Sequence, residues 1–147
     1  MKVKFKKLHP DAKIPSRAHS TDAGYDLVAT SRSVIPYPTH SVVYGTGLSI
    51  AIPEGYVGLI YPRSSVCKYD LMLYNSVGVC DSGFSGEIKL VFRDIHAGES
   101  IHTRKIYNVG DRIGQLIIMP LTDVEFEEAE ELGESERGEG GWGSTGE

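Results

Sequence analysis

The sequence has few of the features that mark secreted, membrane-spanning or zinc-binding proteins. Only two cysteines occur in 147 residues, Cys67 and Cys80, and their spacing fits neither a CxxC pair nor a zinc site. The sequence contains no run of about 18 apolar residues, and residues 1–8 alternate lysine with apolar residues instead of forming a signal-peptide core. We therefore expect reduced thiols and a cytoplasmic protein, or a nuclear one if the source is eukaryotic or viral.

Positive charge is scarce as well. The chain carries 15 Lys or Arg against 20 Asp or Glu, which gives a net charge of −5. A non-specific nucleic-acid binder needs a basic face, so we expect no direct nucleic-acid partner. The lack of a long apolar run predicts no membrane partner either. A few well-placed donors can still bind a small phosphate ligand.

Several common catalytic motifs are absent or incomplete. The five histidines form no HExxH pair, and the sequence lacks the His-x-Glu and Pro-Cys-x-x-Cys set of a zinc deaminase. Residues 138–145 fit the glycine and threonine positions of a P-loop, but Ser144 stands where lysine is required. Ser85 lies in Gly-Phe-Ser-Gly, which lacks the second spacer residue of a Gly-x-Ser-x-Gly nucleophile elbow. Other residues must therefore carry any chemistry.

Helical periodicity is weak, and short β-rich runs recur between turns of Gly, Pro, Asp and Ser. Only Ser64–Leu71 predicts a turn or two of helix. The last predicted strand is apolar apart from one glutamine, so we expect it to be covered on both faces. Runs that predict strands are Met1–Leu8, Val42–Ile52, Tyr56–Tyr61, Leu71–Cys80, Glu87–Phe92 and Arg112–Leu121. Length and pattern predict one all-β domain, a sandwich or jelly roll.

The last fifteen residues differ in composition from the rest. Residues 133–147 hold six glycines, one large apolar residue, Trp142, and one basic residue, Arg137. Such a segment buries too little surface to offset the entropy of ordering it, and a frayed tail is the simplest interpretation. The same residues would also suit a lid that closes on an aromatic phosphorylated ligand. We expect a domain over residues 1–132 and a flexible arm over 133–147.

Five segments resemble, in order and spacing, the five motifs of the trimeric deoxyuridine triphosphatase family. They are residues 23–27 (AGYDL), 62–65 (PRSS), 75–87 (NSVGVCDSGFSGE), 110–116 (GDRIGQL) and 137–146 (RGEGGWGSTG). The resemblance implies a distorted jelly-roll or β-clip-like barrel and a homotrimer whose active sites are shared between subunits. It also implies Mg²⁺-dependent hydrolysis of dUTP to dUMP and pyrophosphate, which limits uracil in DNA and supplies dUMP for dTMP synthesis.

The third motif would bind the nucleoside and activate water. By resemblance, Asp81 is the catalytic base for the water that attacks the α-phosphate, although a turn aspartate could instead cap the hairpin. Asn75 has the donors and the acceptor needed to read the O4 and N3–H edge of uracil, although it could be an ordinary strand-end residue. The backbone of Gly78, Val79 and Cys80 would complete the base pocket.

Two further residues extend this nucleoside site. Phe84 matches the aromatic residue on which the deoxyribose packs, where the family usually has tyrosine; a core phenylalanine is the alternative. Gly83 beside it replaces a commonly acidic residue. By the same resemblance, Lys89 occupies a position that touches the nucleotide in relatives. Alternatively, it is an ordinary strand lysine exposed to solvent.

The first, second and fourth motifs would bind the phosphates. Ser64 would act catalytically near the α–β bridging oxygen, with Ser65 beside it. Arg63 would hold phosphate or tie Asp26 in place. Asp26 would bind Mg²⁺ through water or orient that arginine. Gln115 would contact the phosphates, or bond to neighbouring backbone because a buried amide needs partners.

The arm would complete the site. Arg137 resembles an arginine finger for the γ-phosphate, and Trp142 would stack on the uracil where the family usually has phenylalanine. Gly143, Ser144 and Thr145 would wrap the β- and γ-phosphates. Two alternatives stay open: a dCTP deaminase, or bifunctional deaminase and diphosphatase, of the same fold, and a non-catalytic regulatory binding module.

Overall fold

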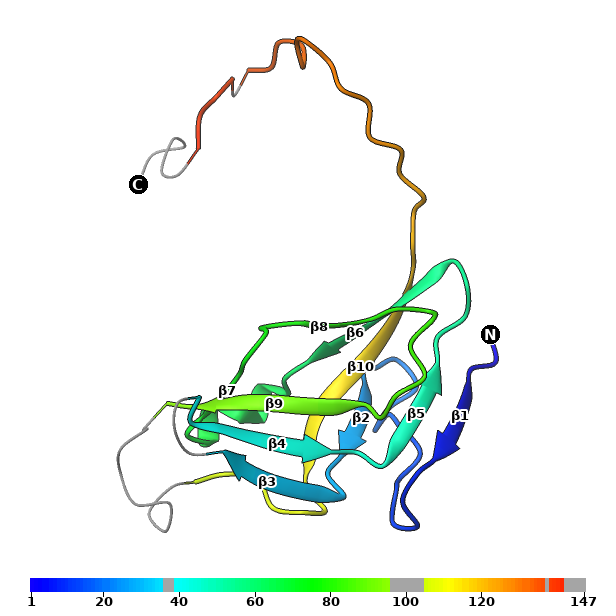
Figure 1. The fold of residues 1–147 in the computed structure, drawn as a ribbon, viewed down its shortest axis with the longest axis vertical. Coiled ribbons are helices and arrows are strands. Elements are labelled where there is room, and N and C mark those ends of the chain that lie inside the picture. The colour runs from blue at the N-terminus through cyan, green and yellow to red at the C-terminus, as the bar shows by residue number, and fades with distance from the viewer. Residues whose placement is uncertain (36–38, 96–104, 137, 142–147) are drawn as a thin grey trace.

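The computed structural model describes residues 1–35, 39–95, 105–136 and 138–141, and within these ranges it contains strands and one short 3-10 helix, with no α-helix (Figure 1). The elements follow in the order β1 (Lys4–Lys7), β2 (Tyr25–Val28), β3 (Ser31–Ile35), β4 (Ser41–Gly45), β5 (Leu48–Ala51), β6 (Tyr56–Tyr61), η1 (Ser64–Lys68), β7 (Leu71–Leu73), β8 (Gly78–Cys80), β9 (Lys89–Asp94) and β10 (Arg112–Pro120). No helix in the described part is long and apolar enough to cross a membrane.

The strands form two four-stranded antiparallel sheets and a small two-stranded one. Their orders are β2-β10-β6-β8, β3-β4-β9-β7 and β1-β5. Buried side chains from all three sheets form a single hydrophobic cluster. The all-β prediction is confirmed, and in the part of the chain that the structure describes the sheets stay open at their edges.

Strand β9 shows how the sequence pattern sets this core. Leu90 and Phe92 are buried while Lys89 and Val91 are exposed, because successive side chains of a strand point to opposite faces. The Phe92 ring meets that of Tyr44 edge-on, with centroids 5.7 Å apart and planes at 81°. Aromatic pairs prefer this arrangement, and it joins β9 to the neighbouring β4.

Two predicted strands are each divided in the structure. The run Val42–Ile52 becomes β4 and β5, separated at Gly47, whose φ of +64° suits glycine. The run Leu71–Cys80 becomes β7 and β8, which lie in different sheets, and Ser76 in the intervening turn has a φ of +59°. Both predictions of a single strand were wrong because the positive-φ residues turn the chain between sheets.

The remaining strand predictions fare better. The strands at Tyr56–Tyr61 and Lys4–Lys7 are confirmed, and the predicted helical turn is the 3-10 helix η1. β10 also forms as predicted, but it is covered on both faces only near its start, since Met119 is 46% exposed. Sequence pattern missed β2 and β3, which are short and carry exposed residues among their apolar ones.

Candidate active site

The first, second and fourth motifs meet around β10, the strand that runs through the middle of its sheet. β10 pairs with β2 on one side and with β6 on the other. The register places Gln115 opposite Asp26 of β2 and opposite Tyr61 at the end of β6. The second motif follows Tyr61 directly, so strand pairing alone gathers three distant parts of the chain.

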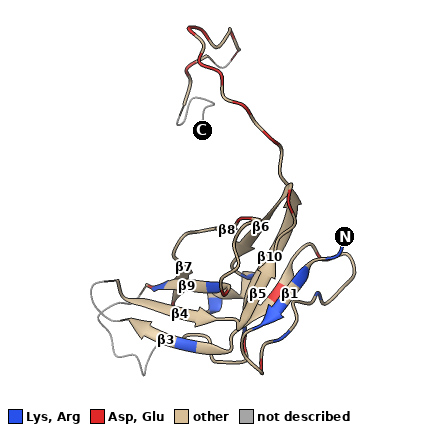
Figure 2. Ribbon diagram, turned by 45° about the vertical axis from the view of Figure 1, so that its right-hand side comes forward, with Lys and Arg blue, Asp and Glu red and all other residues tan. Residues whose placement is uncertain are grey.

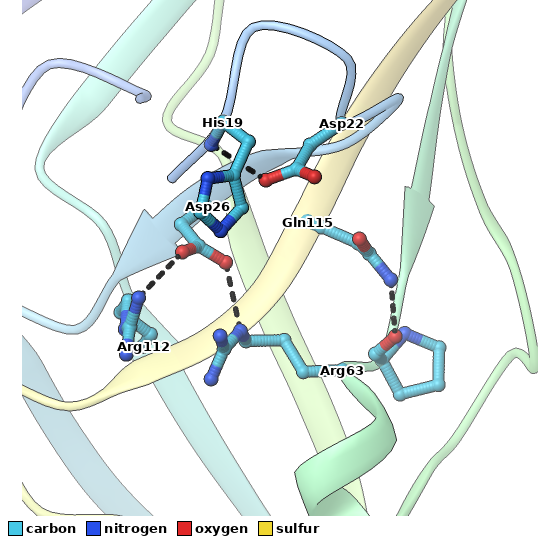
Figure 3. Close-up of polar contacts among 7 residues, drawn as sticks. His19, Asp22, Asp26, Arg63, Arg112 and Gln115 are labelled. Carbon is cyan, nitrogen blue, oxygen red and sulfur yellow. Dashed lines mark hydrogen bonds and ion pairs between the residues drawn. The ribbon is translucent and has the colours of Figure 1, made fainter. Parts of the chain in front are cut away.

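An ion triad ties the three motifs together (Figure 3). The Asp26 carboxylate accepts a hydrogen bond from Arg63 Nε at 2.7 Å and another from Arg112 Nη1 at 3.1 Å. Its side chain is only 15% exposed, so these charge-assisted bonds are partly shielded from water. Two guanidinium groups face one carboxylate, which leaves positive charge at this end of the sheet. Arg112 was missed in the sequence, although it lies inside the fourth motif.

Gln115 provides a second link between the same motifs. Its Nε2 donates to the Pro62 carbonyl at 3.1 Å, so in this chain the amide bonds to neighbouring backbone (Figure 3). Gly24 of the first motif lies against the Gln115 side chain so closely that a Cβ there would overlap it. The glycine is therefore required by the position of the glutamine.

The hydroxyls of the second motif lie in the first turn of η1. Ser64 is exposed and Ser65 is half-buried. Arg63 precedes the helix in an extended conformation, with its guanidinium held by the ion triad. Residues 63–65 thus present one fixed cation and two hydroxyl groups on a single short segment.

A separate cavity of about 300 Å³ brings together three of the predicted nucleoside-binding residues: Asn75, Gly78 and Lys89. Its complete lining is Ile60, Leu73, Tyr74, Asn75, Gly78, Lys89, Leu90 and Val91. An apolar wall with a few polar groups is typical of sites for small molecules. Tyr74 was not predicted, although it directly precedes Asn75 in the sequence.

The backbone of β8 approaches this cavity closely. A Cβ on Gly78 would lie 3.2 Å from Ile60 and 3.4 Å from the Asn75 amide nitrogen, so glycine keeps the space beside Asn75 open. Val79 is 65% exposed and Cys80 is buried. Burial raises the pKa of the Cys80 thiol and the nearby Asp81 charge raises it further, so Cys80 stays neutral.

Asp81 and Phe84 lie exposed in the turn after β8. No hydrogen bond or ion pair within the described residues engages the Asp81 carboxylate; the turn is held instead by the Phe84 amide, which donates to the Asp81 carbonyl at 3.1 Å. Phe84 is 45% exposed, with its ring against Gly86, so it does not belong to the core. Both side chains are available to a ligand.

Within one chain, the third motif lies beside β6, where Gly78 pairs with Ile60, but it makes no polar contact with the described phosphate-binding residues. Across the described ranges, no hydrogen bond or ion pair joins Asn75, Asp81 or Phe84 to Arg63 or Gln115. No group of three or more His, Cys, Asp or Glu that could hold a metal ion occurs there either. The predicted arm residues lie outside the described residues: Arg137, Trp142, Gly143, Ser144 and Thr145.

Comparison with known proteins identifies the class of fold and then the family. A glycine-to-serine variant of the Staphylococcus bacteriophage 80alpha dUTPase, solved with dUpNHpp, is 31% identical to this chain and superposes with a TM-score of 0.82. The match covers 99% of this chain and 98% of that one. A variant of the dUTPase of phage phi11 of S. aureus, solved to reveal the coordination of a structural Mg(II) ion, is 29% identical with a TM-score of 0.73. That match covers 90% of this chain and 99% of the phage chain. These neighbours confirm the jelly-roll-like prediction.

Sequence relatives agree with this structural class. The deoxyuridine 5'-triphosphate nucleotidohydrolases of Rhodococcus erythropolis and Corynebacterium glutamicum are 42% and 41% identical to the chain. The matches cover 99% and 98% of this chain and 87% and 94% of those proteins. The dUTPase family model matches residues 10–146, and the chain belongs to the dUTPase family.

The contact between Gly24 and Gln115 predicts the effect of a single added methyl group. Gly24→Ala should displace the glutamine and lower the free energy of unfolding by about 1–3 kcal/mol, since overpacking a close contact is costly. Urea unfolding at fixed protein concentration measures the change. Gly83→Ala is the matched control, because nothing lies within 4 Å of its added Cβ and its effect should stay within about 0.5 kcal/mol. Equal losses in both variants would contradict this reading of Gly24.

Proposed function

We propose that the protein is a dUTP diphosphatase that hydrolyses dUTP to dUMP and pyrophosphate, so limiting uracil in DNA and supplying dUMP. One observation carries the proposal: Asn75, Gly78 and Lys89 surround a cavity next to the turn in which Asp81 has an uncommitted carboxylate. The family match over residues 10–146 supports the same reaction and does not favour a deaminase or a binding module. The free thiols of Cys67 and Cys80 suit a reducing cytoplasm, where we place the reaction.

The nucleoside would enter the cavity with its uracil edge against Asn75. The amide of Asn75 can satisfy both O4 and N3–H, whereas cytosine presents the opposite pattern and would leave polar groups unpaired. The backbone from Gly78 to Cys80 would complete this recognition, and Lys89 borders the same cavity while pairing with Glu87 at 3.4 Å. The Phe84 ring, exposed and uncharged, would pack on the deoxyribose and exclude a 2′-hydroxyl.

Catalysis would take place between this cavity and the ion triad. Asp81 would accept a proton from the water that attacks the α-phosphate in line. Ser64 would donate to the oxygen that leaves, where negative charge develops, with Ser65 and Arg63 on the neighbouring phosphate oxygens. Gln115 would act by fixing Pro62 and, with it, the start of the phosphate-binding segment.

Mg²⁺ is the cofactor of the family. The described residues form no cluster of three or more potential ligands, so the phosphates and water would provide most of its coordination. Asp26 would contact the cation through bound water, because each carboxylate oxygen already accepts from an arginine whose positive charge opposes a cation in direct contact. When bound, the cation neutralises charge on the triphosphate.

We propose a homotrimer in which each site takes its third motif from another copy. The lack of any hydrogen bond or ion pair between Asp81 and the Asp26 triad among the described residues of one chain supports this, because the reaction needs both at one phosphate. The segment that follows β10 supports it as well. Residues 121–136 leave the sheets as an extended segment (Figure 1), and Phe126 and Leu132 are 95% and 97% exposed.

The extended segment and β1 are complementary in charge and pattern. Residues 121–136 carry eight Asp or Glu and no Lys or Arg, whereas three of the four residues of β1 are lysines (Figure 2). Among the described residues β1 pairs only with β5, so its other edge can accept a strand. An apolar cavity of about 470 Å³ lies beside β1 and includes Val3 and Phe5. Val124 and Phe126 of another copy would fit this surface, and the arm over residues 133–147 would continue to the active site.

Within the arm, Arg137 would hold the γ-phosphate, Trp142 would stack on the uracil, and Gly143, Ser144 and Thr145 would wrap the β- and γ-phosphates. Glycine-rich segments lose much entropy on ordering, so closure of this lid should depend on the ligand. Trp142 is the only tryptophan and would report closure by fluorescence.

The substrate assignment is tested by pyrophosphate release from dUTP, dTTP, dCTP and UTP with Mg²⁺, using the wild type and Asp81→Asn. We expect activity on dUTP alone, and a loss of about 100-fold or more in the variant because the general base is removed. UTP should be rejected, since Phe84 excludes the 2′-hydroxyl by volume. Ammonia release from dCTP would show a deaminase, no activity would show a binding module, and full activity of Asp81→Asn would remove Asp81 from its role.

The assembly is tested by reversing charge on β1. Lys4→Glu combined with Lys6→Glu should weaken the trimer, because acidic residues would then face the acidic segment. Light scattering after size-exclusion chromatography, over a dilution series, measures the mass. Lys13→Glu is the control, an exposed lysine outside β1 that should leave the trimer intact. A trimer equally stable in all three proteins would contradict the proposed docking on β1.

A further inference from the structure

Tyr107 is a buried tyrosine that precedes the fourth motif and that the proposed mechanism does not use. Its side chain is 1% exposed, and its ring packs on that of Tyr69, which directly follows η1, with centroids 3.9 Å apart. The rings of Phe92 and Tyr44 lie at 5.7 and 6.1 Å on other sides. Four aromatic rings therefore connect the core to the underside of the phosphate-binding helix.

The backbone of Tyr107 is also held firmly. Its carbonyl accepts hydrogen bonds from the Tyr44 hydroxyl at 2.9 Å and from Arg32 Nη1 at 3.0 Å. Two residues earlier, Lys105 exchanges hydrogen bonds with Asp70: its amide donates to the Asp70 carboxylate and its carbonyl accepts from the Asp70 amide, both at 2.8 Å. The position of the Tyr107 ring is thus fixed independently of its hydroxyl.

The Tyr107 hydroxyl has no hydrogen-bond partner among the described residues, although it is fully buried. A buried polar group without a partner is costly, so it calls for an explanation. Burial raises the pKa of Tyr107, and the neighbouring Ser65 hydroxyl and Arg63 charge oppose that rise. The Tyr107 ring packs on Tyr69 at the end of η1, the helix that carries Ser65, yet no hydrogen bond joins its hydroxyl to Ser65.

We propose that Tyr107 is a positioning residue for phosphate binding, whose hydroxyl donates to Ser65 Oγ when a phosphate occupies the site. A serine hydroxyl has one proton and can accept as well as donate. Once Tyr107 donates to it, Ser65 directs its own proton to the phosphate, and each bond strengthens the other. The proposal rests on the proposed function, since it needs a phosphate beside Ser65.

Tyr107→Phe removes only this hydroxyl and tests the role. The KM for dUTP and the Kd for dUpNHpp should rise roughly two- to tenfold, with kcat changed much less, because the bond forms in both the bound and the transition state. The unfolding midpoint should stay unchanged or rise, since the lost group has no partner in the free protein. In a Ser65→Ala background, Tyr107→Phe should have no further effect on KM or Kd.

Tyr44→Phe is the matched control, since it removes another buried hydroxyl from the same cluster. It should lower the unfolding midpoint, through loss of its bond to the Tyr107 carbonyl, and change the KM much less than Tyr107→Phe does, since Arg32 still holds that carbonyl. An unchanged KM and Kd in Tyr107→Phe, or an equal rise with and without Ser65, would overturn the role of Tyr107. A wild type that neither hydrolyses dUTP nor binds dUpNHpp would instead refute the proposed function, and this inference with it.

Discussion

The position of β10 between β2 and β6 is the constraint on which the phosphate-binding half of the molecule depends. Antiparallel pairing fixes the register on both sides, so Gln115 lies opposite both Asp26 and Tyr61. The ion triad and the bond from Gln115 to Pro62 then hold the second motif against the sheet. A slip of one residue in β10 would turn these side chains to the other face and separate the motifs.

Sequence pattern predicted the parts of the fold that obey simple alternation. β6 and β9 bury alternate residues and were both found, and β10 was found from its continuous apolar run, which buries the neighbours Ile113 and Gly114. It failed where a positive φ turns the chain between sheets, at Gly47 and Ser76, because apolar residues continue on both sides of the turn. The short strands β2 and β3 lack a distinct pattern and depend on pairing with distant partners.

The residues of the candidate site came from resemblance to family motifs, and their contacts came from the structure. The link between Asp26 and Arg63 was one of the alternatives expected from the motifs, but nothing in the sequence indicates that Arg112 bonds the same carboxylate. Likewise, Tyr107 reads as one more apolar position until its buried hydroxyl is placed near Ser65. Contacts of this kind depend on three-dimensional register, which short motifs do not encode.

The central claim is that each active site joins the Asp26 triad and η1 of one copy to the Asp81 turn of another. Mixing two inactive variants by co-refolding, Asp81→Asn and Ser64→Ala, tests it most directly, because neither side chain bonds to another described residue. Shared sites predict that dUTP hydrolysis returns to about a quarter of the wild-type rate, the fraction of interfaces with both residues intact. Activity no higher than that of the separate variants would contradict the claim.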